Sequence, residues 1–297
     1  MDIMERKGIN NIYMKFENTE VMNFKGAFRG LRNPLESWSK SDSCIGLFSE
    51  SDIDYYLNDV IYMWIDNENE LRKKENKEPF DYGSDEYFKV SEKYDDWLSN
   101  QGILYHDDAY YNAAFLGPND LSLAQRMIKA GSSDRKFLRQ IIVSVDITAP
   151  LYWWKEFDTY KVGTVANSTS TMHKLGSTPI TKECFEMNDM DKDLLLYENN
   201  EPESPTLSVE EYWNMLIVDL EHLRKKYNQT KDKRYWKELI RLLPESWLQT
   251  RTVTMNYEVL RNIYSQRKNH RLTEWHTFCR WIETLPYANE LILYNLD

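Results

Sequence analysis

The dominant pattern along the chain is an apolar residue at every third or fourth position, which places apolar side chains on one face of an α-helix. The run from Ser51 to Asn76 opens with a Ser-x-x-Asp capping signature and keeps its apolar residues on one face. These residues are Ile53, Leu57, Val60, Ile61 and Trp64. The same spacing predicts helices over residues 25–38, 119–131, 208–230, 231–243, 252–269 and 272–285. A helix-rich protein is therefore expected.

Strand-like segments are fewer. Residues 12–24 contain two β-prone pieces around Asn18, and residues 139–150 alternate apolar and polar positions up to Pro150. Residues 75–100 and 176–206 are acidic and interrupted by proline, without firm periodicity. We interpret both as exposed excursions from the core.

Composition restricts the possible functions. The chain has 297 residues, and 37 Lys plus Arg against 48 Asp plus Glu give a net charge of −11, which argues against general nucleic-acid binding. The three cysteines are widely spaced, so neither a disulfide framework nor a structural zinc site is expected. No signal-peptide core and no run of 18 apolar residues is present. A cytoplasmic protein without a membrane segment is expected.

Common catalytic signatures are missing from the sequence: it contains no G-x-S-x-G, GxGxxG, P-loop or H-E-x-x-H motif. Among the five histidines, His270 and His276 are the two that lie near each other in sequence. Their spacing of six residues does not place them on one helix face, so no metal site is expected.

A stretch rich in hydroxyl side chains follows the predicted strand that ends at Pro150. It contains Asn167, Ser168, Thr169 and Ser170 in succession. Amide and hydroxyl donors of this kind suit a phosphate, and Lys161 and His173 lie on either side as possible cations. This stretch is predicted to be a binding loop.

The strongest local signal lies between Leu243 and Arg267. Its buried stripe is formed by Met255, Val259, Leu260, Ile263 and Tyr264, which leaves Asn256, Arg261, Asn262 and Arg267 for another face of the predicted helix. For a single helix, the simplest interpretation of such a face is that solvent covers it. The order of these polar residues suggests a further interpretation.

The block LPESWLQTRTVTMNYEVLRNIYSQR resembles the C-terminal motif of the flavin-dependent thymidylate synthases, in which a Leu-Pro pair precedes a helix that begins with Asn. In this alignment Asn256 matches the flavin-contacting Asn, Asn262 the second Asn or His, and Arg267 the Arg that binds the nucleotide. His276 and Arg280 stand where the family commonly carries Gln and Arg. Upstream, residues 129–161 resemble the family's Gly-His-x-Ser segment, strand and helix in order and length.

The family's signature motif is altered in this chain. When Asn167 is taken as its Asn, Ser170 is its second Ser, but Tyr160, Lys161 and Val162 replace Arg-His-Arg. Ser168 replaces Glu and Met172 replaces the last Arg. Charge-assisted hydrogen bonds contribute about 1.5–3 kcal/mol each, so these replacements bear directly on nucleotide and flavin binding.

The resemblance implies an α+β fold with a central antiparallel sheet and packed helices. It implies one domain over residues 1–297, with insertions at about 45–115 and 176–206, and a homotetramer whose sites form between subunits. The family activity is reductive methylation of dUMP to dTMP, in which methylenetetrahydrofolate provides the methylene group and FAD, reduced by NADPH, provides hydride. On this basis Arg267 and Ser170 are expected to be catalytic.

Further site residues follow from the same resemblance. The residues expected to contact a pyrimidine deoxynucleotide are Arg267, Ser170, Asn167 and Lys161. Those expected to contact FAD are Asn256, Asn262 and His276. Two alternatives stay open: a catalytically inactive relative that acts as a binding or regulatory module, and an unrelated helical interaction protein.

Overall fold

The chain divides into two compact units in the computed structural model, which describes residues 14–106, 109–197 and 206–296. The first unit comprises Met1–Glu17, Asp146–Lys161 and Ala166–Val253. The second unit comprises Asn18–Val145, Val162–Val165 and Thr254–Asp297. The single-domain organisation and the homotetramer stay predictions.

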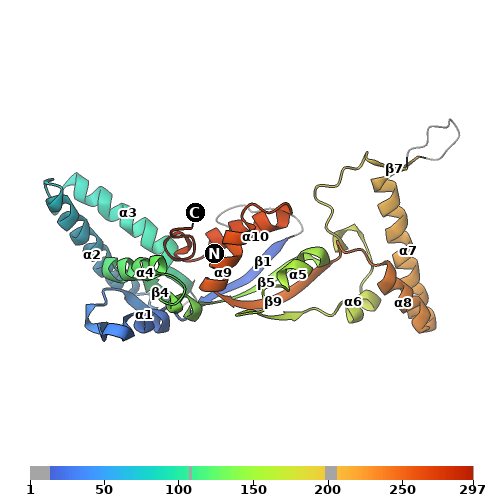
Figure 1. Cartoon of the computed structure of the whole chain (residues 1–297), viewed down its shortest axis with the longest axis horizontal. Helices are drawn as coiled ribbons and strands as arrows, with labels where there is room; N and C mark the ends of the chain where they lie inside the picture. The colour runs from blue at the N-terminus through green and yellow to red at the C-terminus, as the bar shows by residue number, and fades with distance from the viewer. Residues whose placement is uncertain (1–13, 107–108, 198–205, 297) are drawn as a thin grey trace. The chain divides into compact units, whose positions relative to one another are not determined.

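One sheet has four strands in the order β1-β5-β9-β6 (Figure 1). Its strands are β1 (Lys15–Met22), β5 (Ile142–Pro150), β9 (Leu248–Asn256) and β6 (Val165–Ser168). Along β5 the side chains of Val143, Val145 and Ile147 are buried and alternate with partly exposed ones, as the pattern over residues 139–150 predicts.

The second unit contains helices α1 (Phe24–Arg32), α2 (Ile53–Lys74), α3 (Asp85–Gly102), α4 (Pro118–Ala130), α9 (Tyr257–Arg267) and α10 (Thr273–Glu283). It also holds an antiparallel sheet in the order β2-β4-β3, formed by Cys44–Ser49, Tyr110–Phe115 and Ile103–His106. Short helical turns are η2 (Asn33–Leu35), η3 (Trp38–Lys40), η4 (Lys136–Gln140) and η6 (Ala288–Ile292).

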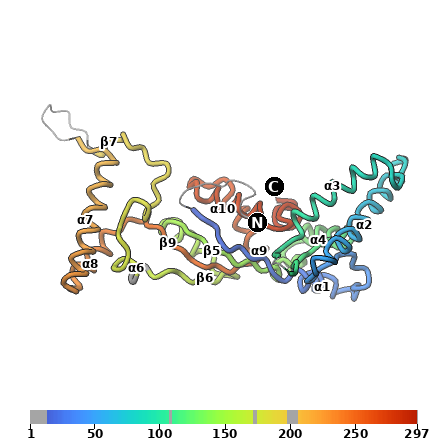
Figure 2. Tube along the Cα trace, turned by 180° about the vertical axis from the view of Figure 1, so that it is seen from behind, coloured from blue at the N-terminus to red at the C-terminus, as the bar shows by residue number. Residues whose placement is uncertain are grey.

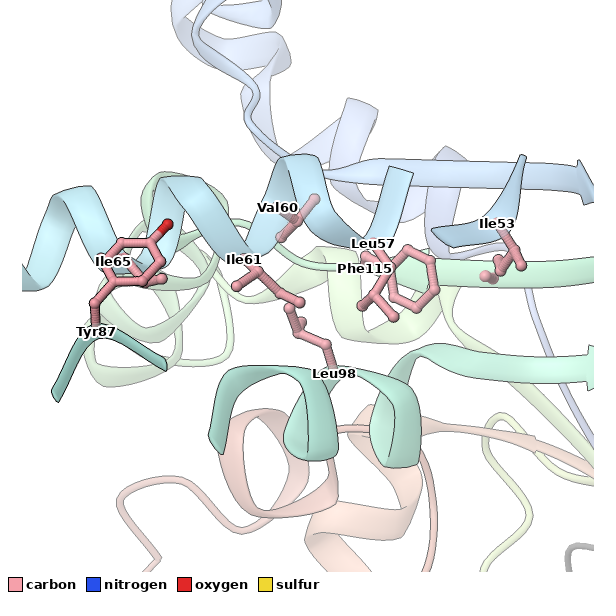
Figure 3. Close-up of a cluster of buried hydrophobic side chains, with 9 residues drawn as sticks. Ile53, Leu57, Val60, Ile61, Ile65, Tyr87, Leu98 and Phe115 are labelled. Carbon is pink, nitrogen blue, oxygen red and sulfur yellow. The ribbon is translucent and has the colours of Figure 1, made fainter. Parts of the chain in front are cut away.

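Helices α2 and α3 run side by side as a hairpin (Figures 1 and 2). The apolar stripe that predicts α2 is buried at Ile53, Leu57, Val60 and Ile61, and it meets side chains of α3 and β4 (Figure 3). Among these is Leu98 of α3, which is fully buried. Burial of this cluster, at roughly 25 cal/mol per Å² of apolar surface, holds the hairpin to the unit.

The first unit contains helices α5 (Leu151–Phe157), α6 (Thr171–Ser177), α7 (Val209–Thr230) and α8 (Lys233–Leu242). It also contains the turn η5 (Lys182–Cys184) and the antiparallel strand pair β7 (Leu195–Tyr197) and β8 (Leu207–Ser208). A reciprocal capping box between Ser208 and Glu211 starts α7. Leu220 and Leu239 from α7 and α8 are buried in one core with Leu175, Ile180, Phe185 and Trp247.

Three predicted elements are corrected by the structure. Residues 252–256 belong to strand β9, and the helix predicted over 252–269 begins only at Tyr257. Much of the excursion predicted at 75–100 is helix α3, capped by Ser84. The cap of α2 is Asp52, which makes no side-chain capping bond, so the predicted Ser51 capping signature is wrong.

The α+β class expected from the sequence is confirmed, because the structure combines packed helices with antiparallel sheet. Within the described residues, no helix is both long enough and apolar enough to span a bilayer.

Candidate functional site

The start of α9 is built around Asn256. This residue is the N-cap of α9, with extended backbone, and its Oδ1 accepts a hydrogen bond of 3.0 Å from the backbone N–H of Val259. The next residue, Tyr257, is fully buried and donates its N–H to the carbonyl of Ile141 at 3.1 Å. The cap leaves Nδ2 of Asn256 without a hydrogen bond to another described residue, so this amide group keeps a donor for a ligand.

Gly163 lies against this cap. Its φ of 79° is in the left-handed region, and a Cβ built on it meets Cγ2 of Val259 at 2.9 Å and Nδ2 of Asn256 at 3.2 Å. Only glycine satisfies both the backbone conformation and this close approach. Gly163 is not among the residues predicted from the sequence, although a glycine next to the altered signature motif is the available signal.

Arg261 occupies the core and not the polar face predicted for it. Its side chain is 5% exposed, and its guanidinium donates to the carbonyls of Ile292 at 2.8 Å and Tyr294 at 2.7 Å. Burial lowers the pKa of Arg261. Arg261 therefore anchors the C-terminal segment to α9, and the single polar face predicted for α9 is wrong.

The remaining polar residues of α9 fall on two faces. Asn256 and Arg267 are eleven positions apart, which leaves them within about 20° of each other around the helix. Asn262 lies about 120° away from Asn256. It is exposed and accepts a hydrogen bond of 2.9 Å from Gln266. By ideal helical spacing, Asn256 and Arg267 therefore share one side of α9, about 16 Å apart along its axis, and Asn262 lies on another side.

Arg267 is held at the end of α9 by an aromatic ring. Its guanidinium carbon lies 4.5 Å from the ring centroid of Trp275, which is fully buried on α10. This cation–π contact fixes the position of a partly exposed cation. Trp275 is a second residue that the sequence analysis misses; tryptophan directly before His276 is the signal in the sequence.

His276 is locked in one tautomer by its surroundings. Its Nε2 lies 2.7 Å from the carbonyl oxygen of His270, and a carbonyl only accepts, so Nε2 carries the proton. Elsewhere between α9 and α10, Tyr264 donates to Glu283 at 2.8 Å, and burial together with this carboxylate raises the pKa of Tyr264 to about 12. The His276 ring is therefore held by its hydrogen bond to His270, and Tyr264 ties α9 to α10.

The predicted binding loop belongs mainly to the first unit, and its candidate side chains are exposed. These are Lys161, Asn167 and Ser170. The backbone of the loop is nevertheless tied to β9: Thr169 donates its N–H to Thr250 at 2.9 Å, and Gln249 donates to the carbonyl of Thr169 at 3.0 Å. The loop thus presents polar side chains from a fixed backbone, while the His173 side chain lies outside the described part.

A cation lies near this loop on β9. The Arg251 guanidinium carbon is 4.2 Å from the Trp154 ring centroid, and its Nη1 pairs with Asp158 at 2.7 Å. Because Asp158 neutralises part of its charge, Arg251 is a weaker anion ligand than an unpaired arginine.

A pocket of about 320 Å³ lies elsewhere in the second unit, and none of the predicted site residues lines it. Its lining includes Phe24, Ile45, Leu104 and Asn112. The part of the chain that the structure describes contains no group of three His, Cys, Asp or Glu side chains able to hold a metal ion.

Comparison with known proteins gives structural neighbours only. No protein-family model matches the sequence, and no curated protein matches it. The flavin-dependent thymidylate synthase ThyX from Helicobacter pylori, complexed with FAD and dUMP, is 16% identical with a TM-score of 0.43, over 61% of this chain and 84% of that chain. A UMP/dUMP methylase, PolB, from Streptomyces cacaoi bound with 5-Br UMP is 13% identical with a TM-score of 0.40, over 59% and 84%. Since both TM-scores are below 0.5, the proposal below depends on this chain's own residues.

Proposed function

We propose that this protein is a divergent flavin-dependent thymidylate synthase-like protein that binds a pyrimidine deoxynucleotide, dUMP or a close analogue, together with FAD. The observation that carries the proposal is that Asn256 and Arg267, which helical spacing puts on one side of α9, are each held by a contact of their own. Both residues match the family motif in sequence, and both have a donor or cation held in place at the protein surface.

Each residue contributes a distinct interaction to this proposal. Nδ2 of Asn256 donates to a carbonyl of the flavin, because the other end of its amide group is used by the helix cap. Arg267 offers a positioned positive charge to the nucleotide. The side chains of Ser170 and Asn167 offer neutral donors suited to a phosphate. Asn262 and His276 are further candidates for contact with FAD, and Lys161 for contact with the nucleotide.

The residues present fit a flavin only in part. Amide donors are available at Asn256 and Asn262, but Tyr160, Lys161 and Val162 supply one cation where the family has a charged triplet. When bound, FAD would supply the redox chemistry of the reaction. The chain's own residues orient the nucleotide and stabilise negative charge that develops on the base.

A second candidate function is a non-catalytic module that retains nucleotide binding. The altered triplet favours it, since each lost charge-assisted hydrogen bond removes about 1.5–3 kcal/mol of binding. Such a module would bind the nucleotide through Arg267 without turning it over.

A flavin spectrum and a nucleotide titration test both candidates. The purified protein is expected to be yellow or to bind added FAD, and to bind dUMP more tightly than dTMP or dCMP by calorimetry. Turnover with NADPH and methylenetetrahydrofolate separates the enzyme from the binding module. A colourless protein that binds none of these nucleotides overturns both candidates.

A single variant tests the proposed contact between Arg267 and the nucleotide. Arg267→Gln is expected to weaken dUMP binding by about 1.5–3 kcal/mol through loss of a charge-assisted contact. The matched control is Arg126→Gln, which removes an exposed arginine from α4. Equal affinities for the two variants would rule out the proposed contact.

A further inference from the structure

One exposed face of α2 alternates tyrosine and aspartate. Tyr55, Asp59, Tyr62 and Asp66 are spaced four, three and four residues apart, which keeps them within an arc of about 60° on the helix. All four are exposed. Tyr82, in the connection between α2 and α3, interacts with Tyr62 and extends this face. We call these five residues the tyrosine stripe.

The tyrosine stripe borders the core of the hairpin without being buried in it, and one of its rings, that of Tyr82, lies 5.0 Å from the ring of the core residue Tyr87. The core of the hairpin lies on a different face of α2, where Leu57 and Ile61 are buried (Figure 3). By contrast, the exposed fractions of Tyr55, Tyr62 and Tyr82 are 70%, 48% and 80%. Rigid, exposed tyrosines are enriched in protein interfaces, because they bury a large area at a small cost in side-chain entropy.

The charge of the hairpin indicates what such an interface would bind. Residues 53–102 contain thirteen acidic and six basic side chains, a net charge of −7 within a chain whose total is −11. Neither Asp59 nor Asp66 forms an ion pair with another described residue. The tyrosine stripe therefore combines exposed rings with unpaired carboxylates one helical turn away.

The same hairpin already binds cations in this way within itself. The Arg72 guanidinium carbon lies 4.1 Å from the ring centroid of Phe80, and Nζ of Lys93 lies 5.6 Å from that of Tyr94. The Tyr94 hydroxyl also donates to Glu68 at 2.7 Å. Rings next to carboxylates are thus complementary to Lys and Arg side chains in this part of the molecule.

We propose that the tyrosine stripe is a docking surface for a Lys/Arg-rich polypeptide segment of another protein. The stripe from Tyr55 to Asp66 covers about 16 Å of helix, a length matched by about five residues of extended chain. Cationic side chains of that segment stack on the tyrosine rings and pair with Asp59 and Asp66. The proposal is independent of nucleotide or flavin binding.

The test measures binding of a fluorescein-labelled peptide of about ten residues that alternates Arg and Ala, by anisotropy with the full-length protein. At about 0.15 M salt, where screening limits charge interactions to about 8 Å, micromolar binding is expected. Replacing Arg by Gln in the peptide is expected to abolish it. If the wild-type protein fails to bind the Arg peptide even at millimolar concentration, the proposal is wrong.

Aromatic variants separate the tyrosine stripe from simple charge attraction, because they leave the net charge unchanged. The triple variant Tyr55→Ser, Tyr62→Ser, Tyr82→Ser is expected to bind at least about tenfold more weakly, with each ring contributing about two- to fivefold. The matched control replaces Tyr105, Tyr110 and Tyr212 by Ser; these residues are 58%, 48% and 43% exposed and lie outside the hairpin. Equal loss in both triples overturns the proposal.

Charge variants provide the second comparison. Asp59→Asn with Asp66→Asn is expected to weaken peptide binding at least fivefold, whereas Asp189→Asn with Asp193→Asn, the same charge change at exposed positions of the first unit, leaves it unchanged. Equal weakening would show that affinity follows net charge alone. Light scattering of each variant gives a further outcome: a changed oligomeric state would assign the surface to contacts between copies of this chain and overturn the proposal.

Discussion

Helix α9 and the loop around β6 carry the two groups of candidate ligand contacts, and they differ in how their side chains are held. On α9, Asn256 is committed to a helix cap and Arg267 lies on the ring of Trp275. In the loop, Asn167 and Ser170 are exposed, and the hydrogen bonds that hold the loop to β9 come from its backbone.

This difference separates preorganised contacts from adaptable ones. Ordering an exposed side chain on binding costs about 0.5–1.5 kcal/mol, so the held side chains of α9 avoid a cost that the exposed side chains of the loop meet. Variants of α9 should therefore change stability as well as ligand binding, whereas variants of the loop should change ligand binding alone.

The largest effect on the free energy of unfolding is expected for Arg261→Met. The variant removes the charge-assisted hydrogen bonds to the carbonyls of Ile292, Tyr294 and Asn295, and leaves the Ile292 acceptor buried. A loss of about 3 kcal/mol in unfolding free energy is expected, measured by urea denaturation. Lys161→Met in the loop is the matched control and should change stability by less than about 0.5 kcal/mol. Similar losses in both variants would contradict the distinction.

The next largest loss of stability is expected at Gly163. This residue lies in the loop sequence, but it belongs to the second unit together with α9. Gly163→Ala is expected to cost about 2 kcal/mol, because it adds a close contact with Val259 to the strain of a positive φ. Gly83 has a similar φ of 82° and nothing within 4 Å of its added Cβ, so Gly83→Ala should cost only about 1 kcal/mol. Thermal unfolding of the two variants isolates the contact; identical shifts would show that α9 does not constrain Gly163.

A smaller effect is expected at the cap itself. Asn256→Ala should lower the unfolding free energy by about 1 kcal/mol, since the N–H of Val259 loses its acceptor. Asn256→Asp keeps an acceptor and should restore stability, yet it removes the Nδ2 donor proposed for the flavin. Stability and FAD affinity should therefore separate in the Asp variant. If the Asp variant is as unstable as the Ala variant, Asn256 does more than cap α9.

How far the sequence predicts the fold depends on where the determining contacts lie. Helix α2 is predicted well because its stripe is buried along much of its length. Strand β9 is missed although Val253 and Met255 are buried and Thr252 and Thr254 exposed, because this short period of two runs directly into the helical spacing of residues 257–267. Helix α3 is missed because only three of its residues are buried, so the apolar positions that would reveal a helical period are sparse.

The candidate site shows the same limit. The motif identifies Asn256 and Arg267, and local spacing places them on one helix face. The motif does not reveal that Arg261, five residues after Asn256, is buried and donates hydrogen bonds to backbone carbonyls more than thirty positions away. Nor does it reveal Trp275, because the stacking of Arg267 depends on the packing of α10 against α9. Contacts between distant segments are what a single sequence conceals.

The smallest stability effects are expected in the loop, where they test the comparison most sharply. Asn167→Ala and Ser170→Ala remove exposed side chains, so each should change the unfolding free energy by less than about 0.5 kcal/mol. Each should nevertheless weaken dUMP binding by about 1 kcal/mol, the typical net contribution of one hydrogen bond, when measured by calorimetry. Unchanged dUMP affinity in both variants would remove the loop from the proposed nucleotide contacts, and a large loss of stability would show that its side chains, like those of α9, belong to the folded framework.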